Sequence, residues 1–230
     1  MSINKILDRD IEQIKRLIYE MIYETKIQYA SAFEVVQTDN LELANKTIQN
    51  DQKINDMLNA FTNIALWKII KQRLTAGDLR MAIGSILIAR EIEIIADYAK
   101  KICKYFVLYT PAKEDIQAII VMFNMVIKML DLVSALFNDY DSDQKNKVIE
   151  IEQELNNKFH EFNLDLFYKI RSAKTDAHAL VYFEQIGKLK NLQRAGDHLV
   201  SIQEILVFIR TGSFVELTHN DPDLPNEDDE

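Results

Sequence analysis

The sequence predicts an all-α protein in which six long helices form two tandem, related three-helix bundles. Three observations lead to this fold class. Only 5 glycines and 3 prolines interrupt the 230 residues, which favours a small number of long elements. Apolar residues recur at steps of three and four, the spacing that lines one face of a helix. The two halves of the chain also align with each other at an offset of 100 to 101 residues.

The first half is expected to contain three helices. The first runs from about residue 5 to 36, and its apolar stripe consists of Leu7, Ile11, Ile14, Ile18 and Met21. The second follows the stretch QTDN, where Asp39 is expected to be the N-cap, and it ends near Gly77. The third runs from residue 78 to about 107, because Pro111 and the residue before it do not continue a helix.

The second half repeats this order. Helices are expected from about 116 to 137, from 142 to 171 and from 176 to 210. We therefore divide the chain into a first repeat, 1–110, a second repeat, 111–212, and a tail, 213–230. The last ten residues contain six acidic side chains and no basic one, so we expect this tail to be disordered.

Composition narrows the classes of function. A formal charge of −9 disfavours nucleic acid as a partner, since binding it requires a basic face. Cys103 is the only cysteine, which excludes intrachain disulfides and CxxC sites; it is expected to be a small core residue in a reducing compartment. The longest uncharged apolar run, Ile116 to Ile127, is shorter than the roughly 20 residues that span a bilayer. We therefore expect a soluble, cytoplasmic protein.

Acidic and amide side chains form a candidate metal site in the first half. Glu93 and Asp97 lie one helical turn apart and share a face, and Asp51 and Asn55 have the same spacing on the preceding helix. If these two helices pack antiparallel, the oxygen ligands converge. Such ligands suit Mg, Mn, Fe or Zn. The alternative is an ordinary solvated face whose charges are offset by Arg90 or Lys100.

The repeat places similar groups in the second half. Glu152 with Asn156 corresponds to Asp51 with Asn55, and Gln193 with Asp197 corresponds to Glu93 with Asp97. Only Glu152 and Asp197 are charged there, because the other two positions carry amides. His198 is either a further ligand or a hydrogen-bonded packing residue.

Two segments, DLRMAIGSILIAREIEIIADYAKKI and NLQRAGDH, together with the order of helices, resemble the PhoU family. Members carry a motif close to DLERIGD in each half, here EIEIIAD at 91–97 and LQRAGDH at 192–198. The resemblance implies two three-helix bundles and, as in some members, multinuclear Fe or Zn clusters. Its implied ligands are Asp51, Glu93, Asp97, Glu152 and Asp197.

The same resemblance implies a function. It is that of a negative regulator of phosphate uptake and phosphate homeostasis, which binds a phosphate ABC transporter, a sensor histidine kinase, or both, at the cytosolic face of the membrane. The protein is then expected to form a homodimer and to reach the membrane only through its partner.

Two other classes of function stay open at this point. A metal-free helical scaffold or adaptor for another complex fits the neutral Asn55, Asn156 and Gln193. A metal-dependent hydrolase or oxidase would need the same carboxylates, but the sequence has no HExxH, P-loop or GxSxG pattern. We therefore expect a regulator and not an enzyme.

Overall fold

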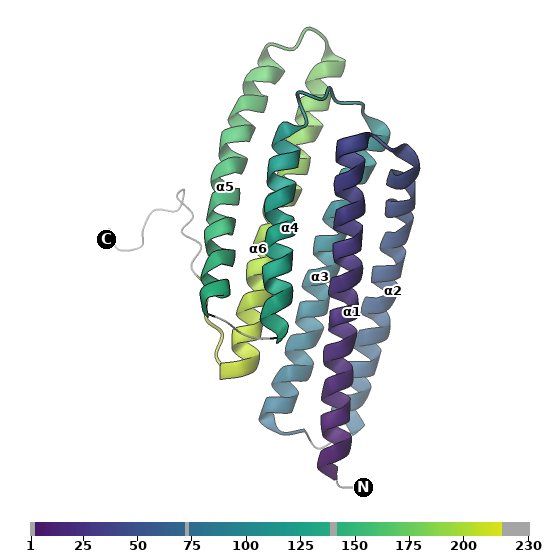
Figure 1. Cartoon of the computed structure of the whole chain (residues 1–230), viewed down its shortest axis with the longest axis vertical. Helices are drawn as coiled ribbons and strands as arrows, with labels where there is room; N and C mark the ends of the chain where they lie inside the picture. Colours follow the sequence, from purple (N-terminus) through teal and green to yellow (C-terminus); the bar gives the residue numbers. More distant parts are fainter. Residues whose placement is uncertain (1–2, 72–73, 139–141, 218–230) are drawn as a thin grey trace, which may run out of the picture.

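The computed structural model describes residues 3–71, 74–138 and 142–217. Within these residues the chain forms six helices that run alternately up and down one long axis (Figure 1). They are α1 (Ile3–Thr38), α2 (Leu41–Lys71), α3 (Ala76–Leu108), α4 (Gln117–Asn138), α5 (Ser142–Arg171) and α6 (Asp176–Thr211). The predicted all-α class with six long helices is confirmed.

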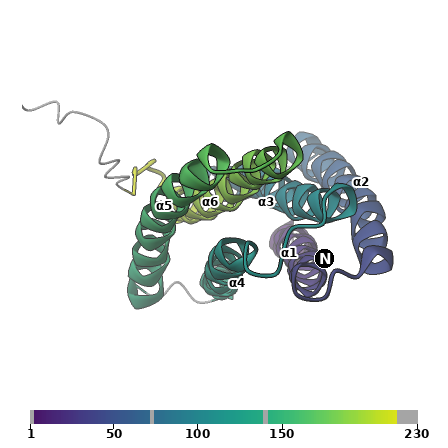
Figure 2. The same ribbon diagram turned by 90° about the horizontal axis from the view of Figure 1, so that it is seen from above.

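The helices pack as two groups of three. Helices α1, α2 and α3 contact one another, as do α4, α5 and α6, and the two groups meet where α3 packs against α6 and α1 against α4. Seen from above, α3 and α6 lie in one row with α2 and α5 at its two ends, while α1 and α4 lie on the same side of that row (Figure 2). The core therefore continues from one bundle into the other.

Two helix starts differ from the sequence prediction. Asn40, and not Asp39, caps α2: its side-chain oxygen accepts a hydrogen bond from the Leu43 amide at 3.0 Å. Asp39 instead adopts a left-handed conformation with φ of 54°. Helix α3 begins at Ala76 and not at residue 78, because Thr75 and Asp78 form a reciprocal capping box that draws Gly77 into the first turn.

A glycine allows the two bundles to approach each other closely. A Cβ atom on Gly84 of α3 would lie 2.5 Å from Cγ1 of Ile209 on α6, which is closer than real contacts allow. The second repeat has a close contact of its own, where a Cβ on Gly196 would lie 2.6 Å from Cδ2 of Leu155 on α5. These glycines are needed for packing between helices and not for backbone freedom.

One helix in the described part of the chain, Gln117–Phe137 of α4, is long and apolar enough to cross a membrane. This segment is longer than the uncharged run from Ile116 to Ile127, because it continues past the charged Lys128. Half of its apolar window is buried inside the protein. The segment is therefore weak evidence for a membrane span.

The start of the predicted tail packs against α6. The Phe214 ring stacks on Phe208 with centroids 4.0 Å apart, and the amide of the buried Leu217 donates to Glu204 Oε1 at 2.8 Å. Residues 218–230, which carry the acidic run, lie outside the described residues. The prediction of disorder for that run stays a prediction.

Candidate functional site

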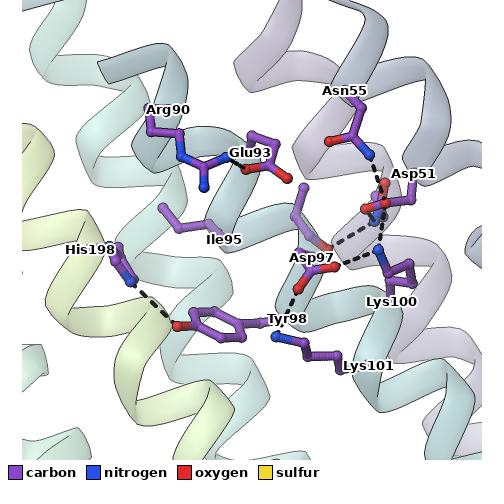
Figure 3. Close-up of polar contacts among 12 residues, drawn as sticks. Asp51, Asn55, Arg90, Glu93, Ile95, Asp97, Tyr98, Lys100, Lys101 and His198 are labelled. Atoms are coloured by element: carbon purple, nitrogen blue, oxygen red, sulfur yellow. Dashed lines mark hydrogen bonds and ion pairs between the residues drawn. The ribbon is translucent and has the colours of Figure 1, made fainter. Parts of the chain in front are cut away.

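A lysine joins the carboxylates of the first repeat. Asp51 on α2 and Asp97 on α3 face each other, and Lys100 lies between them (Figure 3). The Lys100 Nζ atom donates to Asp51 Oδ2 at 2.7 Å and is also paired with Asp97. Lys101, one position further along α3, pairs with the other oxygen of Asp97 at 2.8 Å.

Asp51 is held by amides as well as by the lysine. Asp51 is only 4% exposed, so the charge of its carboxylate requires partners. Gln28 of α1 donates to Asp51 Oδ1 at 3.3 Å and to the Ala96 carbonyl at 2.9 Å, and Asn55 donates to Asp51 Oδ2 at 3.2 Å. All three helices of the first bundle thus meet at this carboxylate.

Glu93 lies on the same face of α3 but has a different partner. It pairs with Arg90, one turn earlier, as Figure 3 shows. Burial raises the pKa of Glu93, and although Arg90 opposes this shift, Asp97 and Asp51 add to it. Arg90 and Lys100 thus pair with these acids, although Asp51 is buried and does not lie on the solvated face that the alternative to a metal site assumed.

The lysine determines the ionisation of Asp97. Burial alone would raise the pKa of this carboxyl, but hydrogen bonds from Lys100 and Lys101 outweigh it and lower the pKa. Burial likewise opposes the charge of Lys100, yet its bonds to Asp51 and Asp97 raise the pKa of the ammonium. Asp97 and Lys100 are therefore both ionised at neutral pH.

In the second repeat, a chain of amide side chains contacts the buried acid. Asn156 donates to the buried Glu152 through its amide nitrogen, and Gln193 donates to Asn156 Oδ1 at 2.7 Å. The Lys190 Nζ atom then donates to Gln193 Oε1 at 2.8 Å. At the offset that aligns Asp97 with Asp197, Lys100 aligns with Val200, so a lysine is not repeated at that position.

His198 contacts the other repeat. Its Nδ1 atom lies within hydrogen-bond distance of Glu91 on α3, and its Nε2 atom is 3.4 Å from the Tyr98 hydroxyl. A carboxylate oxygen accepts, so this contact is a hydrogen bond when Nδ1 carries the proton. This geometry matches the packing alternative for His198 better than the ligand alternative.

Several of the predicted metal ligands contact polar side chains in the structure. Lys100 occupies the position between Asp51 and Asp97 that a cation would take. Among the described residues there is no group of three or more His, Cys, Asp or Glu side chains that could hold a metal ion. The predicted ligands Asp51, Glu93, Asp97, Glu152 and Asp197 therefore stay a prediction, which direct metal analysis must test.

Sequence reasoning missed two features of this site. The role of Gln28 had no signal, because a single glutamine on a long helix has no motif, and its partners lie 23 and 68 residues away. The bridge from Lys100 to Asp51 spans 49 residues. The helical spacing indicates Lys100 as a counter-charge for the acids of its own helix, but not its contact with Asp51.

Fold and site together define a class: helical tandem-repeat proteins in which each bundle contains a buried carboxylate on its second helix. The family model "PhoU domain" matches this chain twice, over residues 18–106 and 119–206, once in each bundle. These matches cover most of the chain, which therefore belongs to the PhoU family.

Relatives and solved structures agree with this assignment. The chain is 28% identical over 214 residues to the "Phosphate-specific transport system accessory protein PhoU homolog" of Zymomonas mobilis, covering 90% of this chain and 88% of the relative. A protein of the same name from Borreliella burgdorferi is 29% identical, with coverage of 94% and 100%.

The solved structures support the fold. The phosphate transport system regulatory protein PhoU from Streptococcus pneumoniae superposes with a TM-score of 0.79 at 17% identity, over 92% of this chain and all of that one. PhoU from Pseudomonas aeruginosa gives the same TM-score at 19% identity, over 90% and 99%.

Proposed function

We propose that this protein is a cytoplasmic negative regulator of phosphate uptake. It acts by docking on a phosphate ABC transporter, on a sensor histidine kinase, or on both, and it restrains import when phosphate is plentiful. The observation that carries the proposal is the double match to the PhoU domain over both bundles, together with relatives named as accessory proteins of phosphate-specific transport. Docking, and not catalysis, is its mode of action.

The end of α2 offers a surface for such docking. Trp67 is 58% exposed and Ile70 is 83% exposed, and Leu66 beside them is also exposed. The Lys71 ammonium lies 4.8 Å above the Trp67 ring. Exposed apolar side chains gathered near one helix end are typical of a protein contact. We assign this surface to the partner, and we expect the protein to work as a homodimer that reaches the membrane only through that partner.

A gene deletion tests the regulatory role. In cells grown with abundant phosphate, loss of the protein should leave uptake of radiolabelled phosphate high, and a plasmid copy should restore the restraint. Unchanged uptake in the deletion strain, with the transporter present, would contradict the proposal.

A metal-free adaptor is the second candidate, and the Lys100 bridge favours it. Elemental analysis of protein purified without chelator or affinity tag distinguishes a metal-binding regulator from a metal-free adaptor. We expect less than one equivalent of Fe, Zn, Mg or Mn in the natural protein. Stoichiometric Fe or Zn that is lost in the Glu93→Ala/Asp97→Ala variant would establish the family-type metal site, and Lys100 would then have to move.

A further inference from the structure

The chain turns back along α6 after that helix ends. Gly212, the C-cap, has a φ of 82°, in the left-handed region where glycine ends a helix without strain. Beyond it the Phe214 ring stacks on Phe208, and the Leu217 amide donates to Glu204 Oε1 at 2.8 Å. Later residues of the chain thus contact earlier residues of the helix, so this segment lies antiparallel to α6.

Phe208 and Glu204 belong to one partly exposed stripe of α6, because residues four apart share a face of a helix. The stripe lies between Gln193, which contacts α5, and His198, which contacts α3. It faces away from α4, the third helix packed on α6, so no described helix covers it (Figure 2). Towards the start of α6 the stripe continues at helical spacing through Ser201, Asp197, Arg194 and Lys190.

Two cations on the stripe, Arg194 and Lys190, form no ion pair with a carboxylate of the described residues. Arg194 is exposed. Lys190 donates to the neutral Gln193 Oε1 at 2.8 Å, and its ammonium lies 5.1 Å from the centre of the Phe159 ring. Neither contact of the lysine neutralises its charge. An acidic group brought to this part of α6 would therefore meet two positive charges.

The remaining chain reaches these cations in a favourable register. A helix rises about 1.5 Å per residue, which places Asp197 about 10 Å and Arg194 about 15 Å beyond Glu204. An extended chain covers about 3.3 Å per residue. Residues 218–220, which carry no acid, therefore pass Asp197 without repulsion. Asp221, the first acid, then comes level with Arg194.

We propose that the acidic end of this chain, residues 221–230, docks on the outer face of α6 and pairs with Arg194 and Lys190. It contains six acidic side chains and no basic one, so the charges are complementary. Its two prolines favour an extended backbone, which lowers the conformational entropy lost on docking. Composition predicts disorder for this run by itself, and the two cations give it one place on the surface.

Docking covers part of the candidate site of the second bundle. Asp197 lies on the stripe and Gln193 lies beside it, under the path from Leu217 to Lys190. An acidic segment of another protein can then bind this face only after the tail leaves. The tail is thus an intramolecular competitor for the outer face of α6.

Zero-length crosslinking with a carbodiimide tests the proposal on the full chain, because the reagent joins a lysine only to a carboxylate in contact with it. Mass spectrometry should find links from Lys190 to acids of residues 221–230. Lys147 is the matched control: it is exposed, and it lies near the start of α5, beside the end of α6 (Figure 1). A tail that does not dock would react with Lys147 at least as often. We expect several-fold more links from Lys190.

Removal of a positive charge from α6 should abolish this difference. Arg194→Gln should lower the yield of Lys190 links several-fold, whereas Arg16→Gln, which removes an exposed arginine of α1, should leave it unchanged. Salt at about 1 M should act like Arg194→Gln, because it screens charges separated by more than about 3 Å. Links within the Lys169–Asp115 pair, whose atoms lie 2.8 Å apart, report that the reagent works.

Equal yields from Lys190 and Lys147, or a yield that Arg194→Gln leaves unchanged, would overturn the proposal. Links confined to covalent dimers would also overturn it, because the tail would then dock on a second copy of the chain. Regulation of phosphate uptake is tested separately by gene deletion, so neither result bears on it.

Discussion

Lys100 stabilises two carboxylates on different helices, one of which is almost fully buried. Replacing it with methionine keeps most of the side-chain volume but leaves Asp51 without its ammonium. We expect Lys100→Met to lower the free energy of unfolding by about 3 kcal/mol, because removing one partner of a buried ion pair strands the other charge. Urea denaturation measures this change. Lys101→Met is the control: that lysine is 46% exposed, and we expect a loss below about 1 kcal/mol.

The same ion pairs predict how stability depends on pH. The pKa of Asp97 is lowered, so its contribution is complete above the ordinary value of 3.8 and is lost as the pH falls through the lower folded value. The pKa of Lys100 is raised, so its contribution is complete below the ordinary value of 10.5 and is lost as the pH rises through the higher folded value. The loss in free energy of unfolding caused by Lys100→Met should thus stay constant between pH 3.8 and pH 10.5, and it should shrink below and above this range. Denaturation of both proteins at acid, neutral and alkaline pH measures it, and a loss that grows at acid pH would contradict the assignment.

At the scale of single residues, the sequence identifies charges but not their partners. The spacing of Glu93, Asp97 and Lys100 on one helix is visible, because helical neighbours follow from sequence alone. The contact of His198 with Glu91 is not, since it joins residues 107 positions apart across the two bundles. Tertiary packing decides which charges meet.

The helices themselves are specified locally by their caps. At the start of α3, the Thr75 hydroxyl accepts from the Asp78 amide at 3.3 Å, and the Asp78 carboxylate accepts in return from the Thr75 amide at 3.1 Å. We expect Thr75→Ala to lower the free energy of unfolding by about 1 kcal/mol. Thermal unfolding followed by circular dichroism measures it. Thr38→Ala, at the end of α1, removes only a hydroxyl that bonds the Glu34 carbonyl of the same helix, so it should change stability less. Equal losses in the two variants would contradict this role of the cap.

Most of each helix is predictable because apolar periodicity extends over many turns. The predicted ranges 142–171 and 176–210 differ from α5 and α6 by at most one residue at each end. The start of α2 is less certain because Asp39 and Asn40 are adjacent and are equally good N-caps. Only the backbone conformation, with Asp39 at φ of 54°, decides between them.

For the whole molecule, the internal repeat predicts the fold but not the equivalence of the two halves. Both bundles bury a carboxylate on the second helix, Asp51 and Glu152, in agreement with the alignment of the halves. The surrounding sequence differs, because Lys100 in the first repeat aligns with Val200 in the second. Both halves thus contain a buried acid, but the lysine that pairs with it in the first half is not repeated in the sequence of the second. The repeat alone predicts the position of such a site better than its chemistry.

Regulation by docking requires that the protein associates with its partner through a defined surface. We would therefore purify the phosphate ABC transporter from phosphate-grown cells in mild detergent and measure how much of this protein accompanies it. The natural protein and the control Leu108→Ala, which alters an exposed side chain at the far end of α3, should be retained. Trp67→Ala should be retained several-fold less, although it unfolds at the same temperature. If the transporter retains neither the natural protein nor the control, and a sensor kinase purified in the same way retains neither, regulation by docking is contradicted.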